Sequence, residues 1–181
     1  MPDMPDTQLI KNQQLAQDTY QLIRLKEGET AASIHLPEGA LIVPLAVWFA
    51  QEDLLQARVS EHHWPIGVWL APEEDPAELA EELTKLTLIA VDFPASKDGR
   101  GYSAARLLRE RYGYKGELRA IGDVLHDEIF YMQRCGFNSF VMRADQDINA
   151  AATALNTFGV KYQGAYDDPV PLFRKRFPAA I

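Results

Sequence analysis

Five short apolar runs recur along the chain, and a polar or helix-like segment separates each run from the next. Continuous apolar runs of this length are typical of strands that are buried on both faces. Strands that alternate with helices at this spacing favour βαβ units and a mostly parallel sheet. We therefore predict an α/β domain with about five mostly parallel strands, at Leu41–Val43, Ile66–Leu70, Leu86–Val91, Leu118–Ile121 and Ser139–Met142. The strand order stays open: the sheet is either open and doubly wound or a partial βα barrel, with flanking helices.

The segments between these runs carry helix signals. The clearest one begins at Asp75, because Asp is a good N-cap, Pro76 suits the first helical position and Glu78 completes a capping box. Right-handed crossovers would place every strand-to-helix loop at the edge where the strands end, the carboxyl edge of the sheet. Further helices are expected at 48–58, from an N-cap at Ser103, from Val124 or Leu125 to Cys135, and from Ile148 to Phe158.

The two ends of the chain fall outside this alternating pattern. Residues 1–36 form an N-terminal extension in which two mildly apolar runs, Leu9–Ile10 and Tyr20–Leu25, predict a small β-hairpin or a pair of short strands. Residues 37–162 contain the α/β domain. Residues 163–181 include three prolines and are expected to form an extended tail that wraps the domain or reaches a partner.

Composition excludes several classes of protein. The net charge of −8 and the pI near 5.0 argue against nucleic-acid binding, which needs a basic face. No run approaches the ~20 apolar residues that span a bilayer, and the N-terminus lacks the layout of a signal peptide. We therefore expect a cytoplasmic protein without a membrane partner. One cysteine excludes an intrachain disulfide and any Cys-clustered metal site, so no metal is predicted and no cofactor is identified.

The stretch from Asp92 to Asp123 is the strongest functional candidate. It leaves the third apolar run, passes a glycine-containing turn and opens a helix, which is an arrangement that favours anions. Seven basic and five acidic residues give it a local positive excess within an acidic chain. The spacing matches neither the P-loop nor the dinucleotide fingerprint. The predicted ligand-binding residues, centred on the loop Ser96–Arg106, are Lys97, Asp98, Gly99, Arg100, Gly101, Tyr102, Ser103, Arg106, Arg119 and Asp123.

Each candidate also has a purely structural interpretation. Arg106 and Glu110 fit an ordinary i, i+4 pair on a solvated helix. Asp98 could act as a base or orient Arg100, but beside Gly99 it also suits a turn. The other catalytic candidates are Asp123, which could equally cap a helix, and His126, which could be a neutral base or a lone surface histidine.

Two other reactive residue types have weak cases. Cys135 is placed at the C-terminal end of its expected helix, where the dipole disfavours a thiolate, so we interpret it as a small core residue. His62 and His63 are adjacent and lack a carboxylate framework, so they make a poor metal site. The run Arg174–Arg176 is a small basic patch that is either solvated or docks an acidic partner.

The central stretch resembles a known bacterial family. The run DFPASKDGRGYSAARLLRERYGYKGELRAIGDV, with IGVWLAPEED before it and RCGF after it, is similar to the family called domain of unknown function 934. The resemblance extends from about Leu41 to Tyr162. Its core positions are Asp92, Phe93, Asp98, Gly99, Arg100, Gly101, Tyr102, Ser103, Arg106, Leu107, Leu108, Arg109, Gly116, Glu117, Arg119, Gly122 and Asp123.

What the resemblance implies is a role in assimilatory sulfite reduction and cysteine biosynthesis, as an oxidoreductase, without established catalytic residues. The chain has no dinucleotide fingerprint, no CxxC and no ligand set for haem or an iron–sulfur cluster. A redox role would therefore need electrons from a bound cofactor or a partner. Two functions remain open: binding of a small anion or cofactor at Ser96–Arg106, or non-catalytic docking of sulfite reductase to its electron donor. The oligomeric state is not predicted.

Overall fold

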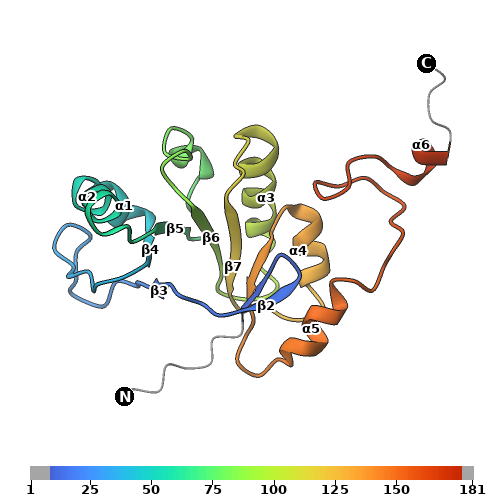
Figure 1. Ribbon diagram of the computed structural model, residues 1–181, viewed down its shortest axis with the longest axis horizontal. Coiled ribbons are helices and arrows are strands. Elements are labelled where there is room, and N and C mark those ends of the chain that lie inside the picture. Colours follow the sequence, from blue (N-terminus) through green and yellow to red (C-terminus); the bar gives the residue numbers. More distant parts are fainter. Residues whose placement is uncertain (1–8, 177–181) are drawn as a thin grey trace.

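The computed structural model describes residues 9–176, which form an eight-stranded sheet in the order β2-β1-β8-β7-β6-β5-β4-β3 (Figure 1). The strands are β1 (Leu9–Lys11), β2 (Gln14–Ala16), β3 (Gln21–Leu22), β4 (Leu41–Pro44), β5 (Ile66–Leu70), β6 (Leu88–Phe93), β7 (Glu117–Gly122) and β8 (Ser139–Val141). The helices are α1 (Leu45–Ala50), α2 (Glu52–His62), the 3-10 turn η1 (Pro76–Leu79), α3 (Arg100–Arg106), its π-helical continuation η2 (Leu107–Arg111), α4 (Ile129–Cys135), α5 (Ile148–Ala154) and α6 (Leu172–Arg176).

The α/β class is confirmed, but the sheet has eight strands instead of the expected five or so. The five expected strands are β4 to β8, and they pair in parallel with one another. Three short strands complete the sheet. The run Tyr20–Leu25 supplies β3, parallel to β4, whereas β1 pairs antiparallel with both β2 and β8 and makes the sheet mixed.

The N-terminal hairpin does not pair the two apolar runs Leu9–Ile10 and Tyr20–Leu25 with each other. It joins β1 to β2 through Asn12 and Gln13, whose φ angles are both positive, as two-residue hairpin turns require. The strand that follows, β3, lies at the opposite edge of the sheet. The polypeptide between β2 and β3 therefore crosses the sheet. Residues 17–25, which include this crossing, β3 and the three residues after β3, are called the N-terminal strap below.

The strand order decides between the two architectures left open by the sequence. From β3 to β8 each strand lies beside its predecessor, which is the order of a βα barrel. In a doubly wound sheet the strand order would reverse at one point. Right-handed crossovers in one direction place the connecting helices on one face. The buried residues of α1 to α5 accordingly join one cluster with every second strand residue, such as Val68, Val91 and Leu118.

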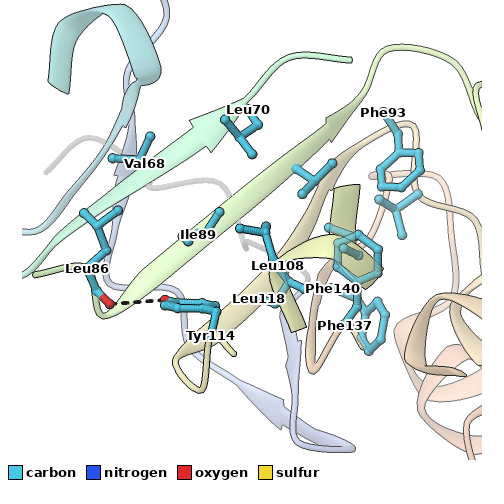
Figure 2. Packing of buried hydrophobic residues seen from close by; sticks show 14 of the residues in the cluster. Val68, Leu70, Leu86, Ile89, Phe93, Leu108, Tyr114, Leu118, Phe137 and Phe140 are labelled. Carbon is cyan, nitrogen blue, oxygen red and sulfur yellow. Dashed lines mark hydrogen bonds between the residues drawn. The ribbon is translucent and has the colours of Figure 1, made fainter. Parts of the chain in front are cut away.

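That cluster is the main core (Figure 2). The rings of Phe93 and Phe137 pack against each other with 5.8 Å between their centroids, and Phe140 and Leu108 belong to the same cluster. Each fully buried aliphatic or aromatic side chain of this kind stabilises the fold by about 1.5–3 kcal/mol. Tyr114 closes the other end of the cluster, where its hydroxyl donates to the Leu86 carbonyl at 3.3 Å.

The opposite face of the sheet is covered by the N-terminal strap. A smaller apolar group including Ile42, Leu88 and Ala90 lies on this face. The indole Nε1 of Trp69 donates to the carbonyl of Ile23 at 2.9 Å, and this bond fixes the strap over the sheet. Charged side chains on the same face hold the strap at two further points and are described with the site.

Several expected helix boundaries shift. The Asp75 cap is confirmed, since its carboxylate accepts from the Ala77 amide at 2.9 Å, although only a short 3-10 turn follows. The helix 48–58 is in fact α1 and α2, and α1 begins directly after β4 without an intervening loop. The helix assigned to 124–135 begins only at Ile129, while its C-cap Gly136 (φ 114°) is confirmed.

The C-terminal residues fold back beside α4 before ending in α6. The Tyr166 amide donates to the Arg134 carbonyl, and Asp167 pairs with Arg134 at 3.0 Å. The C-terminal residues therefore carry contacts to the domain, and their last described segment is helical. Across residues 9–176, every helix is too short or too polar to cross a membrane.

Candidate functional site

Three strand ends meet at the carboxyl edge, and Asp123 connects them. Gly122 ends β7 with a φ of 93°, and a Cβ at that position would lie 2.4 Å from the carbonyl oxygen of Phe93. Only glycine fits there. This close approach lets the Asp123 amide donate to the Phe93 carbonyl at 2.7 Å, so the end of β7 is fastened to the end of β6.

The Asp123 carboxylate then joins the loops that follow β6 and β8. Its Oδ2 accepts from the Ser96 amide at 2.9 Å, and its Oδ1 accepts from Nη1 of Arg143 at 2.6 Å. The Ser96 amide, followed by Arg143, lowers the pKa of this carboxyl, so it is charged at neutral pH. The alternative that Asp123 caps a helix is wrong, because α4 begins later and Glu128 occupies the cap position.

Arg143 belongs to the same edge and was not among the predicted ligand-binding residues. Its Nε and Nη2 bind the carboxylate of Asp145 at 2.6 and 2.8 Å, in addition to the contact with Asp123. The hydrogen bonds from Arg143 lower the pKa of Asp145 to about 2. Its position directly after the fifth apolar run was the available signal, because residues that follow parallel strands gather at this edge.

Arg100 lies at the start of α3 with an exposed guanidinium. Its side chain is 59% exposed, and its Nε and Nη2 bind the two oxygens of Asp98 at 3.0 and 2.6 Å. Asp98 thus orients Arg100, which is one of the roles expected for it from the sequence. The bidentate contact raises the pKa of Arg100 and lowers that of Asp98. Among residues 9–176 no group accepts from Nη1, so the outer Nη1–Nη2 edge of the fork faces solvent.

The other loop candidates divide into exposed and packed positions. Lys97 and Gly99 are exposed, and Gly99 has open space around it. Gly101 instead packs against the Phe93 ring, where a Cβ would come within 2.5 Å of Cζ. Its role is therefore the close approach of α3 to the sheet. Tyr102 is half-buried beside the same ring, with 5.4 Å between ring centroids, and burial raises its pKa to about 12.

The expected N-cap at Ser103 was wrong. The helix begins three residues earlier, and the exposed Ser103 lies inside it. Within the helix, Ala105 and Leu108 are fully buried. The β6–α3 loop is therefore shorter than expected.

Arg106 and Arg119 lie away from the loop. Arg106 pairs with Glu110 at 2.7 Å, as the structural interpretation expected, on the exposed side of α3. Arg119 is 2% exposed on the strap-covered face of the sheet, where it binds Asp18 at 2.9 Å and Glu117 at 2.7 Å and stacks on Tyr20. Its partners tie the N-terminal strap to β7.

His126 lies near Asp123 in sequence but forms a different contact. Its Nδ1 is 3.0 Å from Oε1 of Gln146, in the loop before α5, and the ring is exposed. Cys135 is 4% exposed, and burial raises the pKa of its thiol, in agreement with a packed, unreactive residue. His62 stacks on Trp64. No three His, Cys, Asp or Glu side chains cluster around a metal position in the described part of the chain.

Two further charged residues at or near the carboxyl edge had no local sequence signal. Arg24 of the strap binds Asp92 at 2.8 Å and stacks over Trp69. Glu128 has a buried Oε2 without a partner in residues 9–176, and burial raises its pKa. Arg24 reaches its place through the tertiary fold, because it is 68 residues from its partner.

The fold and this edge define a class before any comparison: an α/β protein with barrel-type strand order and a polar, arginine-bearing edge. The chain belongs to the family described as bacterial protein of unknown function (DUF934), whose model matches residues 67–173, more than half of the chain. The resemblance seen in the sequence is thereby confirmed, although the match begins and ends later than 41–162. The search of curated proteins gave no match.

Proposed function

We propose that this protein binds a small oxyanion, such as sulfite or sulfate, at the carboxyl edge of its sheet and serves assimilatory sulfite reduction. The proposal rests on the guanidinium of Arg100, which Asp98 binds along one edge and leaves open along the other. Asp98 fixes the inner edge of the guanidinium, and the outer edge keeps hydrogen-bond donors toward solvent. A planar fork with two parallel donors matches an oxyanion better than a point charge does.

The neighbouring contacts support a preorganised site. The loop that carries Asp98 is fixed to Asp123 through the Ser96 amide, and Asp123 is fixed in turn by Arg143. The ligand would therefore meet an arginine whose orientation is already determined, which lowers the entropic cost of binding. An electron-transfer step would need a cofactor or a partner protein that supplies the electrons.

Substitution of Arg100 tests this function in a bacterial strain that depends on the protein. Arg100→Lys keeps the charge but removes the fork, so growth on sulfate should slow while growth on cysteine stays normal. The control is Arg111→Lys, because Arg111 is exposed on the same helical segment and its guanidinium lies over the ring of the neighbouring Tyr112. Arg109 is unsuitable as a control, since it is buried and binds three backbone carbonyls. Equal growth of both variants on sulfate would contradict the proposal.

A second function, docking to the sulfite-reducing machinery, is favoured by residues 158–176, called the C-terminal segment here. Five large apolar side chains there are 45–70% exposed, and the basic run Arg174–Arg176 follows them: Phe158, Val160, Tyr162, Val170 and Phe173. Exposed apolar groups beside basic ones suit an acidic protein partner.

Co-purification with the sulfite reductase components tests docking. Tyr162→Asp should abolish co-purification, because it places a charge among the apolar side chains of the C-terminal segment. Leu15→Asp is the matched control, since Leu15 is also exposed, on the edge strand β2 outside this group of side chains. Retention of the reductase by Tyr162→Asp would count against docking. An absorbance spectrum of the purified protein, which reveals a bound flavin or other chromophore, separates the two functions further.

A further inference from the structure

A second cluster of basic groups lies at the opposite, amino edge of the sheet. A pocket of about 250 Å³ opens there between the end of the α3–η2 helix, the end of α4 and the C-terminal segment. Its lining residues are Arg109, Lys115, Gln133, Gly136, Phe137, Asn138, Tyr166 and Asp167. Neither the resemblance nor the carboxyl-edge proposal assigns any function to this pocket.

Arg109 is a buried charge without a carboxylate partner. Its side chain is nearly enclosed, with 5% of the residue exposed, and it forms no ion pair within residues 9–176. Its Nε donates to the Gly136 carbonyl at 2.9 Å, and its Nη1 donates to the carbonyls of Tyr114 and Gly116 at 2.8 and 2.9 Å. Nη2 has only a 3.3 Å contact with Oδ1 of Asn138. The rings of Tyr114 and Tyr166 also lie 5.5 Å from the guanidinium, but no carboxylate of residues 9–176 balances its charge, and such a buried charge favours an added anion.

The groups around Arg109 increase the positive charge of the pocket. Lys115 lines it and forms no ion pair with any described residue. The carboxylate of Asp167 also lines it, but two cations already bind this carboxylate, Arg134 at 3.0 Å and Lys161. Arg109 and Lys115 therefore line the pocket beside a single carboxylate that is already paired, in a chain whose net charge is −8. The side chain of Gln133 also lines the pocket.

We infer that this amino-edge pocket is a binding site for a small dianionic oxyanion, the sulfate or phosphate type of group. The pocket is smaller than the 300–1,000 Å³ of sites for drug-sized ligands. It therefore suits a free oxyanion or the terminal group of a small molecule. Arg109 and Lys115 supply the charge, and Tyr166 of the C-terminal segment covers the guanidinium, with its ring centroid 5.5 Å away. This site is separate from the carboxyl edge and does not depend on the function proposed there.

A nuclear magnetic resonance titration of the full chain tests the inference with inorganic sulfate, inorganic phosphate and glycerol phosphate as probes. The reporters are the Gly116 and Gly136 amides and the Nε–H of Arg109. Saturable shifts of these signals are expected with at least one probe. Tighter binding of glycerol phosphate would show that the group is read as part of a larger molecule, and equal binding that a free oxyanion suffices.

Lys115→Gln should weaken this binding about tenfold, because one charge-assisted contact is lost. Lys115 is exposed, so the fold should be unaffected. Arg111→Gln removes the same charge from a nearby exposed position outside the pocket lining, and it should leave the affinity unchanged. Arg100→Lys should also have no effect on these reporters, which separates this site from the carboxyl edge. Equal weakening by Lys115→Gln and Arg111→Gln, or no saturable shift up to tens of millimolar probe, would overturn the inference and leave Arg109 as a structural residue only.

Discussion

Gly122 shows how much of the carboxyl edge rests on one residue. Its positive φ and its contact with the Phe93 carbonyl bring Asp123 to the position where it joins three loops. The sequence indicated Asp123 by its place after an apolar run. It did not indicate that the preceding glycine is required, because the clash comes from the neighbouring strand.

Gly122→Ala should therefore destabilise the fold by at least about 2 kcal/mol, since a left-handed residue and a backbone clash add together. Urea unfolding followed by circular dichroism measures this loss. Gly99→Ala is the control, because Gly99 has neither a positive φ nor a neighbour within reach of a Cβ. Similar midpoints for the two variants would contradict this account of the turn.

Among elements, the N-terminal strap is the one that the sequence described least well. Arg119 was predicted to bind ligand, but it binds Asp18, which lies 101 residues away. No local pattern encodes such a pair, because the strap becomes its neighbour only through tertiary packing. The buried strands β4 to β8 were predictable for the opposite reason: burial on both faces leaves a largely apolar run in the sequence, although β7 includes Arg119. The edge strands β2 and β3 are short and exposed, and they leave no such run.

The buried ion pair between Glu117 and Arg119 also predicts how stability depends on pH. Burial raises the pKa of Glu117, but Arg119 and Lys11 outweigh burial, and the net effect lowers the pKa below 4.5. A depressed carboxyl pKa contributes stability above the unfolded value, and this contribution is lost as the pH falls through the folded value. The wild-type protein should therefore lose more stability than Glu117→Gln between about pH 5 and pH 3.

Urea midpoints measured across that pH range test this prediction. At neutral pH, Glu117→Gln should be the less stable protein, because Arg119 then keeps only Asp18 as a buried partner. The difference between the two proteins should shrink toward acid. Parallel pH profiles for wild type and variant would show that the charge of Glu117 is not coupled to Arg119 and Lys11. Glu110→Gln, in an exposed pair on α3, is the control and should leave the profile unchanged.

At the scale of the whole molecule, the arginines at the two edges of the sheet differ in their partners. At the carboxyl edge Arg24, Arg100 and Arg143 are each held by aspartates, whereas at the amino edge Arg109 has no carboxylate partner in residues 9–176. The sequence located the first edge, because loops after parallel strands gather there. The sequence did not distinguish buried Arg109 from the exposed Arg106 and Arg111. All three lie on one helical segment, and only the fold decides which of them is enclosed.

The most direct test of the central claim is a sulfite titration that follows the Gly99 and Gly101 amides by nuclear magnetic resonance. Lys115→Gln is the parent protein, so that the amino-edge pocket contributes little. The account predicts saturable shifts at these amides, with an affinity about tenfold weaker in Arg100→Lys and unchanged in Arg111→Lys. Identical titrations for all three proteins, or no saturable shift in the parent, would contradict an oxyanion site at Arg100.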